Sequence, residues 1–274
     1  MLAKEREIMP RHRGKYNPLH SSPYELSRSR VENFVRCPAC FYMRQVEGIK
    51  FPDIPGFNIN EATDILLKKD FDHYRRQQKP HPFLVKNGLS NLIPYRHENF
   101  ELWTQSLHFG AENRFHYDDQ ENNLRVGGGL DDVWLNTISN KLHIVDYKST
   151  SQKKDSGPIT LNDEWKGSYK RQMDFYIWIM KKKGFNVDDV GYFLYCDGNR
   201  FSDKPFLDEE IANMQFRITL IQYKSDLGWI EPTLKKIYKN LRLEKRPNHS
   251  NYCEYGNFLS QSNNIKQVKI KTLF

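Results

Sequence analysis

The strongest constraint on the fold is a short stretch in the middle of the chain, where apolar segments meet charged residues. The segment from Leu142 to Val145 ends directly in Asp146, and Lys148 follows two positions later. Residues two apart on a strand point to the same face, so this carboxylate and this ammonium group are expected side by side. Asp131 follows a run of glycines at the start of another strand-like segment. The pattern predicts two neighbouring strands that bring these three side chains together.

Two carboxylates beside a lysine suit the chemistry of a divalent metal. Carboxylate oxygens bind hard cations such as Mg²⁺ or Mn²⁺. A lysine near such an ion can position or deprotonate a water and stabilise developing negative charge. Asp131 and Asp146 are therefore the candidate metal ligands, and Lys148 is the candidate catalytic lysine. The alternative, a surface ion pair, does not explain why an apolar strand ends in two charges beside Asp131.

The periodicity around this stretch indicates a mixed α/β chain. The region 109–148 is typical of a meander of short antiparallel strands, and the tail after Arg246 is typical of a loop. Helices are expected at 59–75, 165–183 and 226–241, and further strands at 190–196 and 214–223.

The helix expected at 165–183 carries a polar pair. Gln172 and Tyr176 are four residues apart and share a face, where they can orient the lysine or contact a phosphate. A polar helix face with a half-buried tyrosine explains the spacing equally well, so both interpretations stay open. Lys170 and Arg171 precede the pair and are candidate DNA contacts. Interleaved aromatic residues such as Trp165 can stack on unpaired bases or lie in the core.

The order of these motifs resembles the RecB-like branch of the PD-(D/E)XK nuclease superfamily, which includes the CRISPR adaptation nucleases. The resemblance rests on Gly-x-Leu-Asp131, then Ile-Val-Asp146-Tyr-Lys148, then Gln172-x3-Tyr176. It implies a restriction-endonuclease-like α/β core, with a mixed central β-sheet flanked by helices. It also implies that Asp131, Asp146 and the backbone carbonyl of Tyr147 bind Mg²⁺ (or Mn²⁺).

The resemblance also implies a His or Glu on a helix before the sheet, some residues after a glycine. Gly56 leads to Asn60 and Glu61, and Glu61 is a candidate metal ligand. The alternative interpretation of Glu61, a carboxylate in the first turn of a helix, is the favoured one because that position stabilises the helix dipole.

Four cysteines are too few for a disulfide scaffold in a chain of this length and indicate a reduced, intracellular setting. The segments around Cys37 and Cys253 are similar to those that hold an iron–sulfur cluster in some relatives. Gly256 stands where a further cysteine is needed, so no cluster is expected. We expect the two segments to pack together without a metal. A zinc site from Cys37, Cys40, Cys253 and His249 is the alternative, because Cys-x2-Cys is a common half-site.

Composition bears on partners and location. The 42 basic and 34 acidic residues give a formal charge of +8, which favours an anionic partner. Residues Met1 to Lys15 lack the apolar stretch of a secretory signal, and no run is apolar enough to span a bilayer. A cytoplasmic protein with no membrane contact is expected. The domain prediction is a basic flexible arm over 1–26 and one nuclease-like domain over 27–274, with its core at about 56–245.

The sequence therefore predicts a metal-dependent DNA nuclease, most simply an exonuclease in recombination, repair or processing. DNA is the expected substrate, of either strandedness, and partner proteins of a recombination or CRISPR-like system are implied by the resemblance. A non-catalytic nucleic-acid-binding module with the same fold is the alternative. A subunit that is active only with a partner is a third hypothesis.

Overall fold

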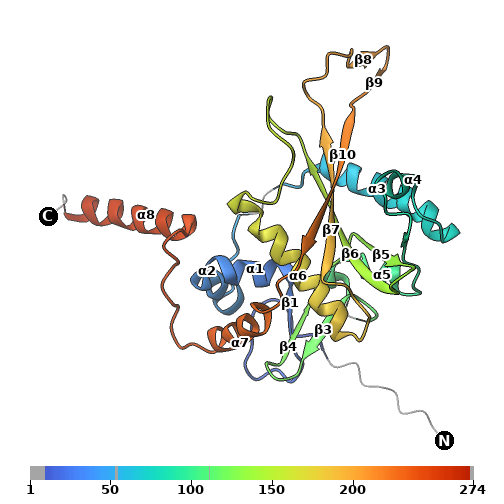
Figure 1. Ribbon diagram of the computed structural model, residues 1–274. Helices are drawn as coiled ribbons and strands as arrows, with labels where there is room; N and C mark the ends of the chain where they lie inside the picture. The colour runs from blue at the N-terminus through green and yellow to red at the C-terminus, as the bar shows by residue number, and fades with distance from the viewer. Residues whose placement is uncertain (1–9, 53–54, 111, 272–274) are drawn as a thin grey trace, which may run out of the picture. The chain divides into compact units, whose positions relative to one another are not determined.

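The structure is a computed structural model that describes residues 10–52, 55–110 and 112–271 (Figure 1). Its internal contacts divide the chain into two compact units. The first unit comprises residues 1–53, 118–127 and 228–274, and the second comprises residues 54–117 and 128–227.

The second unit is built on a five-stranded mixed sheet. In sheet order, its strands are β10 (Phe216–Lys224), β7 (Val190–Gly198), β6 (Lys141–Thr150), β5 (Asp132–Asn136) and β2 (Leu92–Pro94). Only the β6–β7 pair is parallel, and the others are antiparallel. Strand β6 is therefore central, with hydrogen-bonded neighbours on both sides. Strand β2 lies at the edge, where Pro94 costs no internal ladder bond.

Helices cover both faces of this sheet. Helices α3 (Asn58–Gln77) and α4 (Pro82–Lys86) pack on the face that carries Tyr147, where Phe71, Leu84 and Trp134 form a core with it. Helix α6 (Gly167–Lys182) packs on the other face, and nearly all of its middle is buried. A Cβ atom on Gly191 of β7 would come within 2.4 Å of the Met173 sulfur, so the glycine permits this close packing.

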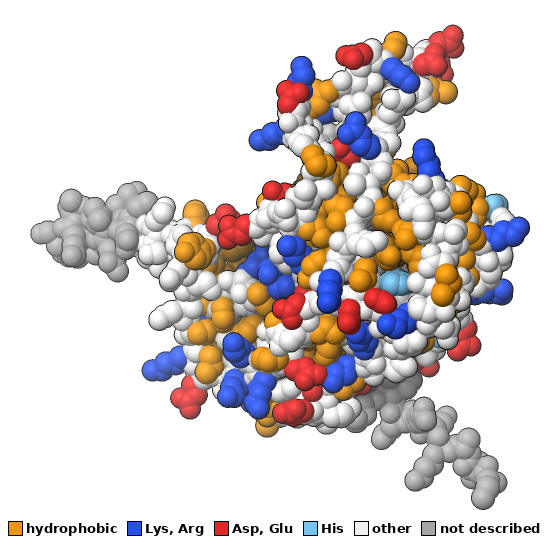
Figure 2. All heavy atoms as spheres, in the orientation of Figure 1, with side chains coloured by type: hydrophobic (Ala, Val, Ile, Leu, Met, Phe, Trp, Pro, Cys, Tyr) orange, Lys and Arg blue, Asp and Glu red, His pale blue; other side chains and the backbone are white. Residues whose placement is uncertain are grey.

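The remaining parts of the second unit are short. Helix α5 (Phe100–Trp103) and single turns at Leu107–Phe109 and Glu164–Lys166 connect the larger elements. The small hairpin of β8 (Leu207–Asp208) and β9 (Ile211–Ala212) lies at the tip of the connection between β7 and β10. Figure 2 shows acidic, basic and apolar side chains together on this tip.

The first unit joins the two ends of the chain. It contains β1 (Tyr24–Ser27), α1 (Arg28–Arg36), α2 (Pro38–Tyr42), a π-helical turn (Met43–Glu47), β4 (Leu124–Gly127), α7 (Ile230–Leu241) and α8 (Glu254–Lys271). Strand β1 pairs in parallel with β4, and β3 (His116–Asp119) completes a sheet of order β1-β4-β3. Tyr42 donates from its hydroxyl to the Leu243 carbonyl at 2.9 Å, which ties α2 to the segment after α7.

The fold class is as the sequence predicts: a mixed central sheet flanked by helices. Two local predictions are wrong. The region 109–148 is not one meander, because β3 and β4 belong to the sheet with β1 and only β5 and β6 belong to the central sheet. The tail after Arg246 is not all loop, because α8 begins at Glu254. The polar sequence of α8 gives it almost no apolar stripe, which is why periodicity missed it.

The N-terminal arm predicted over 1–26 falls partly outside the described residues. From residue 10 it contacts the rest of the first unit: Tyr24 is fully buried, pairs with Leu124 of β4 and donates from its hydroxyl to the Gln45 side chain at 2.8 Å. The single-domain boundaries remain a prediction beside the two-unit arrangement. Within the described residues, no helix is long and apolar enough to cross a membrane.

Candidate active site

Asp146 and Lys148 lie on the central strand β6 and form an ion pair. The Asp146 side chain is 2% exposed and the Lys148 side chain 14% exposed. The Lys148 Nζ also donates to the carbonyl oxygen of Tyr147 at 3.3 Å. At these positions β6 is paired with β7 on one side, and on the other side the Tyr147 N–H donates to the Asp131 side chain. The two residues therefore share a face as predicted and are held in contact.

Asp131 joins this pair through the backbone. Its Oδ2 accepts a hydrogen bond from the Tyr147 backbone N–H at 2.9 Å. In the β5–β6 register Asp132 faces Val145, so Asp131 stands one position beyond, next to Asp146. The three residues singled out by the sequence are thus brought to one place.

The neighbouring Asp132 has a different role. Its side chain is fully buried and accepts from Arg75 at 2.5 Å, the Tyr147 hydroxyl at 2.7 Å and the Trp134 indole at 3.0 Å. A buried carboxylate with this many donors is a structural ion-pair centre. Of the two adjacent aspartates, Asp131 and Asp132, only Asp131 is therefore available to the site.

Helix α3 adds a carboxylate that the sequence did not single out. Lys68 Nζ lies 2.7 Å from Asp64 and 3.5 Å from Asp131 Oδ1. Burial and the nearby charge of Asp131 raise the pKa of Asp64 above its ordinary value, against the lowering effect of Lys68 and Lys148. Asp64 therefore lies within electrostatic reach of Asp131 and Lys148. The side chain of Glu61, the candidate from sequence, is exposed three residues earlier on the same helix.

A sequence signal for Asp64 did exist. Asp64 and Lys68 are four residues apart, a spacing that pairs opposite charges on one helix face. Thr63 and Ser149 share a hydrogen bond between their hydroxyl groups, which attaches α3 to β6 beside the site. That long-range contact, which brings Asp64 rather than Glu61 to the strand, is not visible in local spacing.

Helix α6 contacts the site through Tyr169, a residue that the sequence did not single out. Lys148 Nζ lies 4.8 Å from the centre of the Tyr169 ring, a cation–π distance. Gln172 is buried one turn further along. The Tyr176 hydroxyl packs on Gly128, where a Cβ atom would come within 2.6 Å of it. Tyr176 thus contacts the glycine turn that precedes Asp131.

The basic residues of α6 and its approach differ in exposure. Lys170 and Arg171 are partly exposed. Lys166 is buried, donates to the Thr160 carbonyl at 2.6 Å and pairs with Asp163. Its ammonium group is therefore bound within the protein. Trp165 is 60% exposed, which leaves its ring accessible for stacking.

Tyr195 of β7 is a second residue that sequence patterns missed. It lies opposite Lys148 in the parallel β6–β7 register and is 2% exposed. Within the described residues, its hydroxyl has no hydrogen-bond partner. Burial, with smaller effects from Tyr169 and Asp146, raises its pKa well above the ordinary tyrosine value. It is therefore a neutral donor beside the acidic centre.

The donor set fits a hard divalent cation. Asp64, Asp131 and Asp146 supply carboxylate oxygens and Tyr147 supplies a carbonyl oxygen, the ligand type of Mg²⁺ and Mn²⁺. Burial, and after it the charge of Asp131, raise the pKa of Asp64, so both effects disfavour its charged form. A cation bound between the carboxylates would stabilise their charged forms. The site contains no thiolate or imidazole ligand among the residues described above.

The comparison with known families agrees with this geometry. A sequence model of the PD-(D/E)XK nuclease superfamily matches residues 75–258, two thirds of the chain. The chain belongs to this superfamily. The matched range includes Asp131, the Asp146-Tyr147-Lys148 triplet and all of α6. Asp64 lies upstream of the matched residues. No curated protein matched the chain. Superfamily membership indicates a nuclease with a nucleic-acid substrate.

Proposed function

We propose that the chain is a Mg²⁺- or Mn²⁺-dependent deoxyribonuclease of the RecB-like branch that hydrolyses phosphodiester bonds from DNA ends. The observation that carries the proposal is the fixed cluster on β6: Asp131 bonded to the Tyr147 N–H, with Asp146 and Lys148 on either side of that residue. This is the arrangement expected of a metal-assisted phosphodiesterase rather than of a surface ion pair.

Asp131, Asp146 and the Tyr147 carbonyl would hold the ion, and Asp64 would complete the carboxylate set in place of Glu61. The ion, when bound, neutralises charge on the scissile phosphate and lowers the pKa of a coordinated water. The protein's own part is positional. Strand β6 fixes two of the ligands, and α3 brings the third carboxylate to them.

Lys148 is the residue best placed to act on the attacking water. Its ammonium group is held between Asp146, the Tyr147 carbonyl and the Tyr169 ring. These contacts restrict its position, so little conformational freedom is lost when substrate binds. In this position it orients the water and stabilises negative charge that develops on the phosphate oxygens.

A basic pocket supports DNA as the substrate. It has a volume of about 370 Å³ and lies just beyond the ends of β6 and β7, next to the catalytic strand. Lys153, Lys154, Arg200 and Arg217 line it, together with the aromatic ring of Phe201. Cations beside an exposed ring are typical of a surface that follows a nucleic-acid backbone and stacks on bases. Asp155 and Asp197 also line the pocket and limit how close a phosphate can approach.

The preference for DNA ends, and any role with partner proteins in recombination or a CRISPR-like system, rest on the resemblance to the RecB-like branch. The test is incubation of the pure protein with labelled linear and closed circular DNA of equal sequence, with Mg²⁺, Mn²⁺ or EDTA. We expect metal-dependent shortening of the linear form and little cleavage of the circle. Equal cleavage of both forms would contradict the exonuclease assignment, and no metal-dependent product on either would contradict the enzyme.

A further inference from the structure

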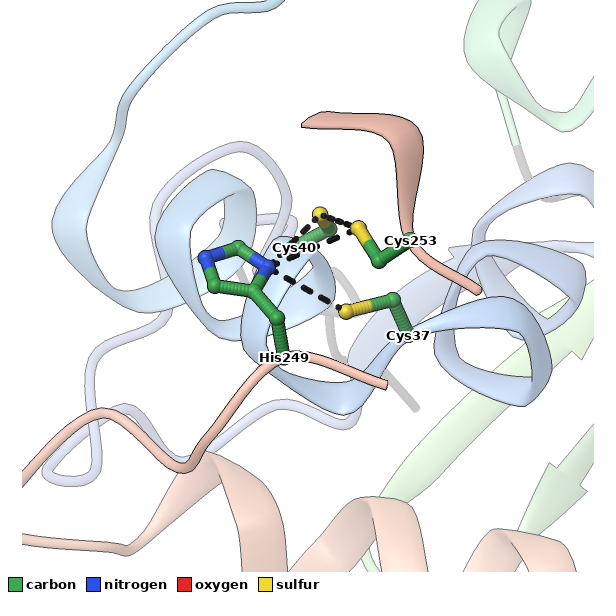
Figure 3. Close-up of side chains that lie close together, drawn as sticks. All are labelled: Cys37, Cys40, His249 and Cys253. Carbon is green, nitrogen blue, oxygen red and sulfur yellow. Dashed lines mark hydrogen bonds between the residues drawn. The ribbon is translucent and has the colours of Figure 1, made fainter. Parts of the chain in front are cut away.

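A second group of ligand-type side chains lies in the first unit, far along the chain from the carboxylates. Cys37 and Cys40 come from the segment at the start of α2, and His249 and Cys253 come from the segment before α8. Figure 3 shows the four side chains pointing toward one another. All three cysteines are buried and none forms a disulfide.

The distances within this group match a single tetrahedral ion. His249 Nδ1 lies 3.5 Å from the sulfur of each of the three cysteines. Tetrahedral zinc with ordinary Zn–S and Zn–N bond lengths separates a sulfur and a nitrogen ligand by about 3.6 Å, and two sulfurs by about 3.8 Å. The Cys40 and Cys253 sulfurs are 3.3 Å apart, and all four ligand atoms lie within 4.8 Å of one another. His249 Nδ1 is thus equidistant from the three sulfurs, as the nitrogen of a tetrahedral site with three sulfur ligands is expected to be.

The backbone around the group favours thiolates. The Ser250 N–H donates to the Cys37 sulfur at 3.5 Å, and the Gly256 N–H donates to the Cys253 sulfur at 3.3 Å. Such outer-shell bonds to sulfur stabilise the deprotonated form that binds metal. They come from the same turn that presents His249 and Cys253.

Gly256 leaves the space that the His249 side chain occupies. A Cβ atom at this position would come within 2.6 Å of the His249 Cβ and Cγ atoms and 3.0 Å of Nδ1. Any larger residue would push the imidazole out of the group. In the sequence, Gly256 stands where an iron–sulfur cluster would need a further cysteine. In the structure, the same glycine leaves room for the imidazole of His249.

We propose that Cys37, Cys40, His249 and Cys253 form a structural zinc site. Four protein ligands close the coordination shell, so no position is open for a water or a substrate. Each cysteine of a [4Fe–4S] cluster binds a different iron atom, which would spread the sulfurs apart, and iron–sulfur clusters use thiolates in preference to a mixed set. This revises the metal-free packing that the sequence favoured.

The site would join segments that are about 210 residues apart in the chain. Neighbouring contacts already connect them: the Phe51 and Tyr255 rings lie 4.7 Å apart, and Arg246 pairs with Glu47 at 2.5 Å. Zinc binding by residues from both segments would couple the folding of the whole first unit to the metal. The proposal does not depend on nuclease activity.

The test is the metal content of the full-length protein, expressed with added zinc and purified without chelators. Elemental analysis should give about one zinc per chain, and the iron and sulfide content should be negligible. Cys40→Ser and His249→Ala should lose most of the zinc. His249→Cys should retain it, because a thiolate replaces the nitrogen. Cys196→Ser, which changes the buried cysteine of β7, and Asp146→Asn, which changes the catalytic site, should both keep it.

Cobalt substitution of the wild-type protein tests the site by absorption spectroscopy. This measurement needs no variant that could fail to fold. Co²⁺ in this site should show the intense visible bands of a tetrahedral thiolate-bound ion, and the Asp146→Asn protein should show them too. A chain without zinc and without these bands would overturn the proposal. So would stoichiometric iron with sulfide, or a Cys40–Cys253 disulfide in place of the metal.

Discussion

Adjacent aspartates at the start of β5 divide two tasks between them. Asp131 faces Lys68 and the Tyr147 N–H at the partly exposed site, whereas Asp132 is buried against Arg75, Trp134 and the Tyr147 hydroxyl. The same chemical group is therefore expected to matter for catalysis at one position and for stability at the next. The difference follows entirely from burial and partners.

Exchanging each of these carboxylates for an amide should separate the two roles. Asp131→Asn should lower DNA cleavage by about 10²- to 10⁴-fold through the loss of a metal ligand, with little change in Tm. Asp132→Asn should lower the free energy of unfolding by about 3–5 kcal/mol because it leaves the Arg75 charge poorly compensated. Thermal unfolding and cleavage assays on both variants check this. Equal effects of both substitutions on Tm would contradict the division.

The upstream acid is a second residue-scale question. Asp64 is paired with Lys68 and close to Asp131, and Glu61 is exposed on the same helix. Asp64→Asn should therefore reduce metal-dependent cleavage by about 10²-fold, with a much smaller reduction for Glu61→Gln. Both substitutions remove one charge from α3, so each controls for the other. A larger loss of cleavage in Glu61→Gln than in Asp64→Asn would indicate that Glu61 is the ligand.

At the scale of elements, the glycine turn before β5 sets where Asp131 stands. The Tyr176 hydroxyl lies against Gly128, so α6 and this turn are packed without space for a methyl group. Gly128→Ala should lower the free energy of unfolding by about 1–3 kcal/mol through overpacking, and cleavage should fall with it. Chemical denaturation measures the first effect.

Gly157 is the matched control for this substitution. A Cβ atom there meets nothing within 4 Å, and its backbone does not need a glycine. Gly157→Ala should therefore change stability by less than about 0.5 kcal/mol. A loss in Gly157→Ala as large as in Gly128→Ala would mean that Tyr176 packing is not the cause.

The elements show which parts of the fold local sequence can predict. Strand β6, helix α3 and helix α6 lie close to their predicted ranges. The apolar spacing does not give the buried face of α3, because Ile59, Ile65 and Leu66 are exposed. Sheet membership was not predictable in the same way. Strands β4 and β5 are separated by four residues, yet one joins β1 and the other joins β6. That choice depends on pairing with a segment about a hundred residues away.

The residues of the candidate site also differ in whether local sequence could predict them. Asp131, Asp146 and Lys148 were predictable because their relation is local to two strands. Asp64, Tyr169 and Tyr195 were not, because each reaches the site by tertiary packing of another element. The group of Cys37, Cys40, His249 and Cys253 was predictable in part. Its residue types could be read from the sequence, but only the fold brings His249 equally near to all three sulfurs.

At the scale of the whole molecule, the formal charge of +8 becomes informative through its distribution. One pocket next to the end of β6 is lined by Lys153, Lys154, Arg200 and Arg217. Changing Lys153 and Arg200 together to glutamine should weaken DNA binding similarly for all sequences. The slope of log affinity against log salt should fall by about 1 for each lost phosphate contact.

Lys86→Gln is the control for this prediction. Lys86 is exposed on α4, remote from the pocket residues in the chain, and carries the same charge. Its replacement lowers the net charge without touching the pocket, so the salt slope should be unchanged. An equal change in slope for Lys86→Gln would show that binding responds to total charge rather than to this surface.

We propose that the cluster around Asp146 on β6 is a metal-dependent phosphodiesterase centre. The most direct measurement is the single-turnover cleavage rate of labelled linear DNA in Mg²⁺ for wild type, Asp146→Asn and Lys148→Ala, with DNA affinity and Tm measured on the same samples. We predict that both variants bind DNA and unfold much as wild type does, while their cleavage rates fall by about 10²-fold or more. Cleavage at the wild-type rate by either variant would contradict the assignment.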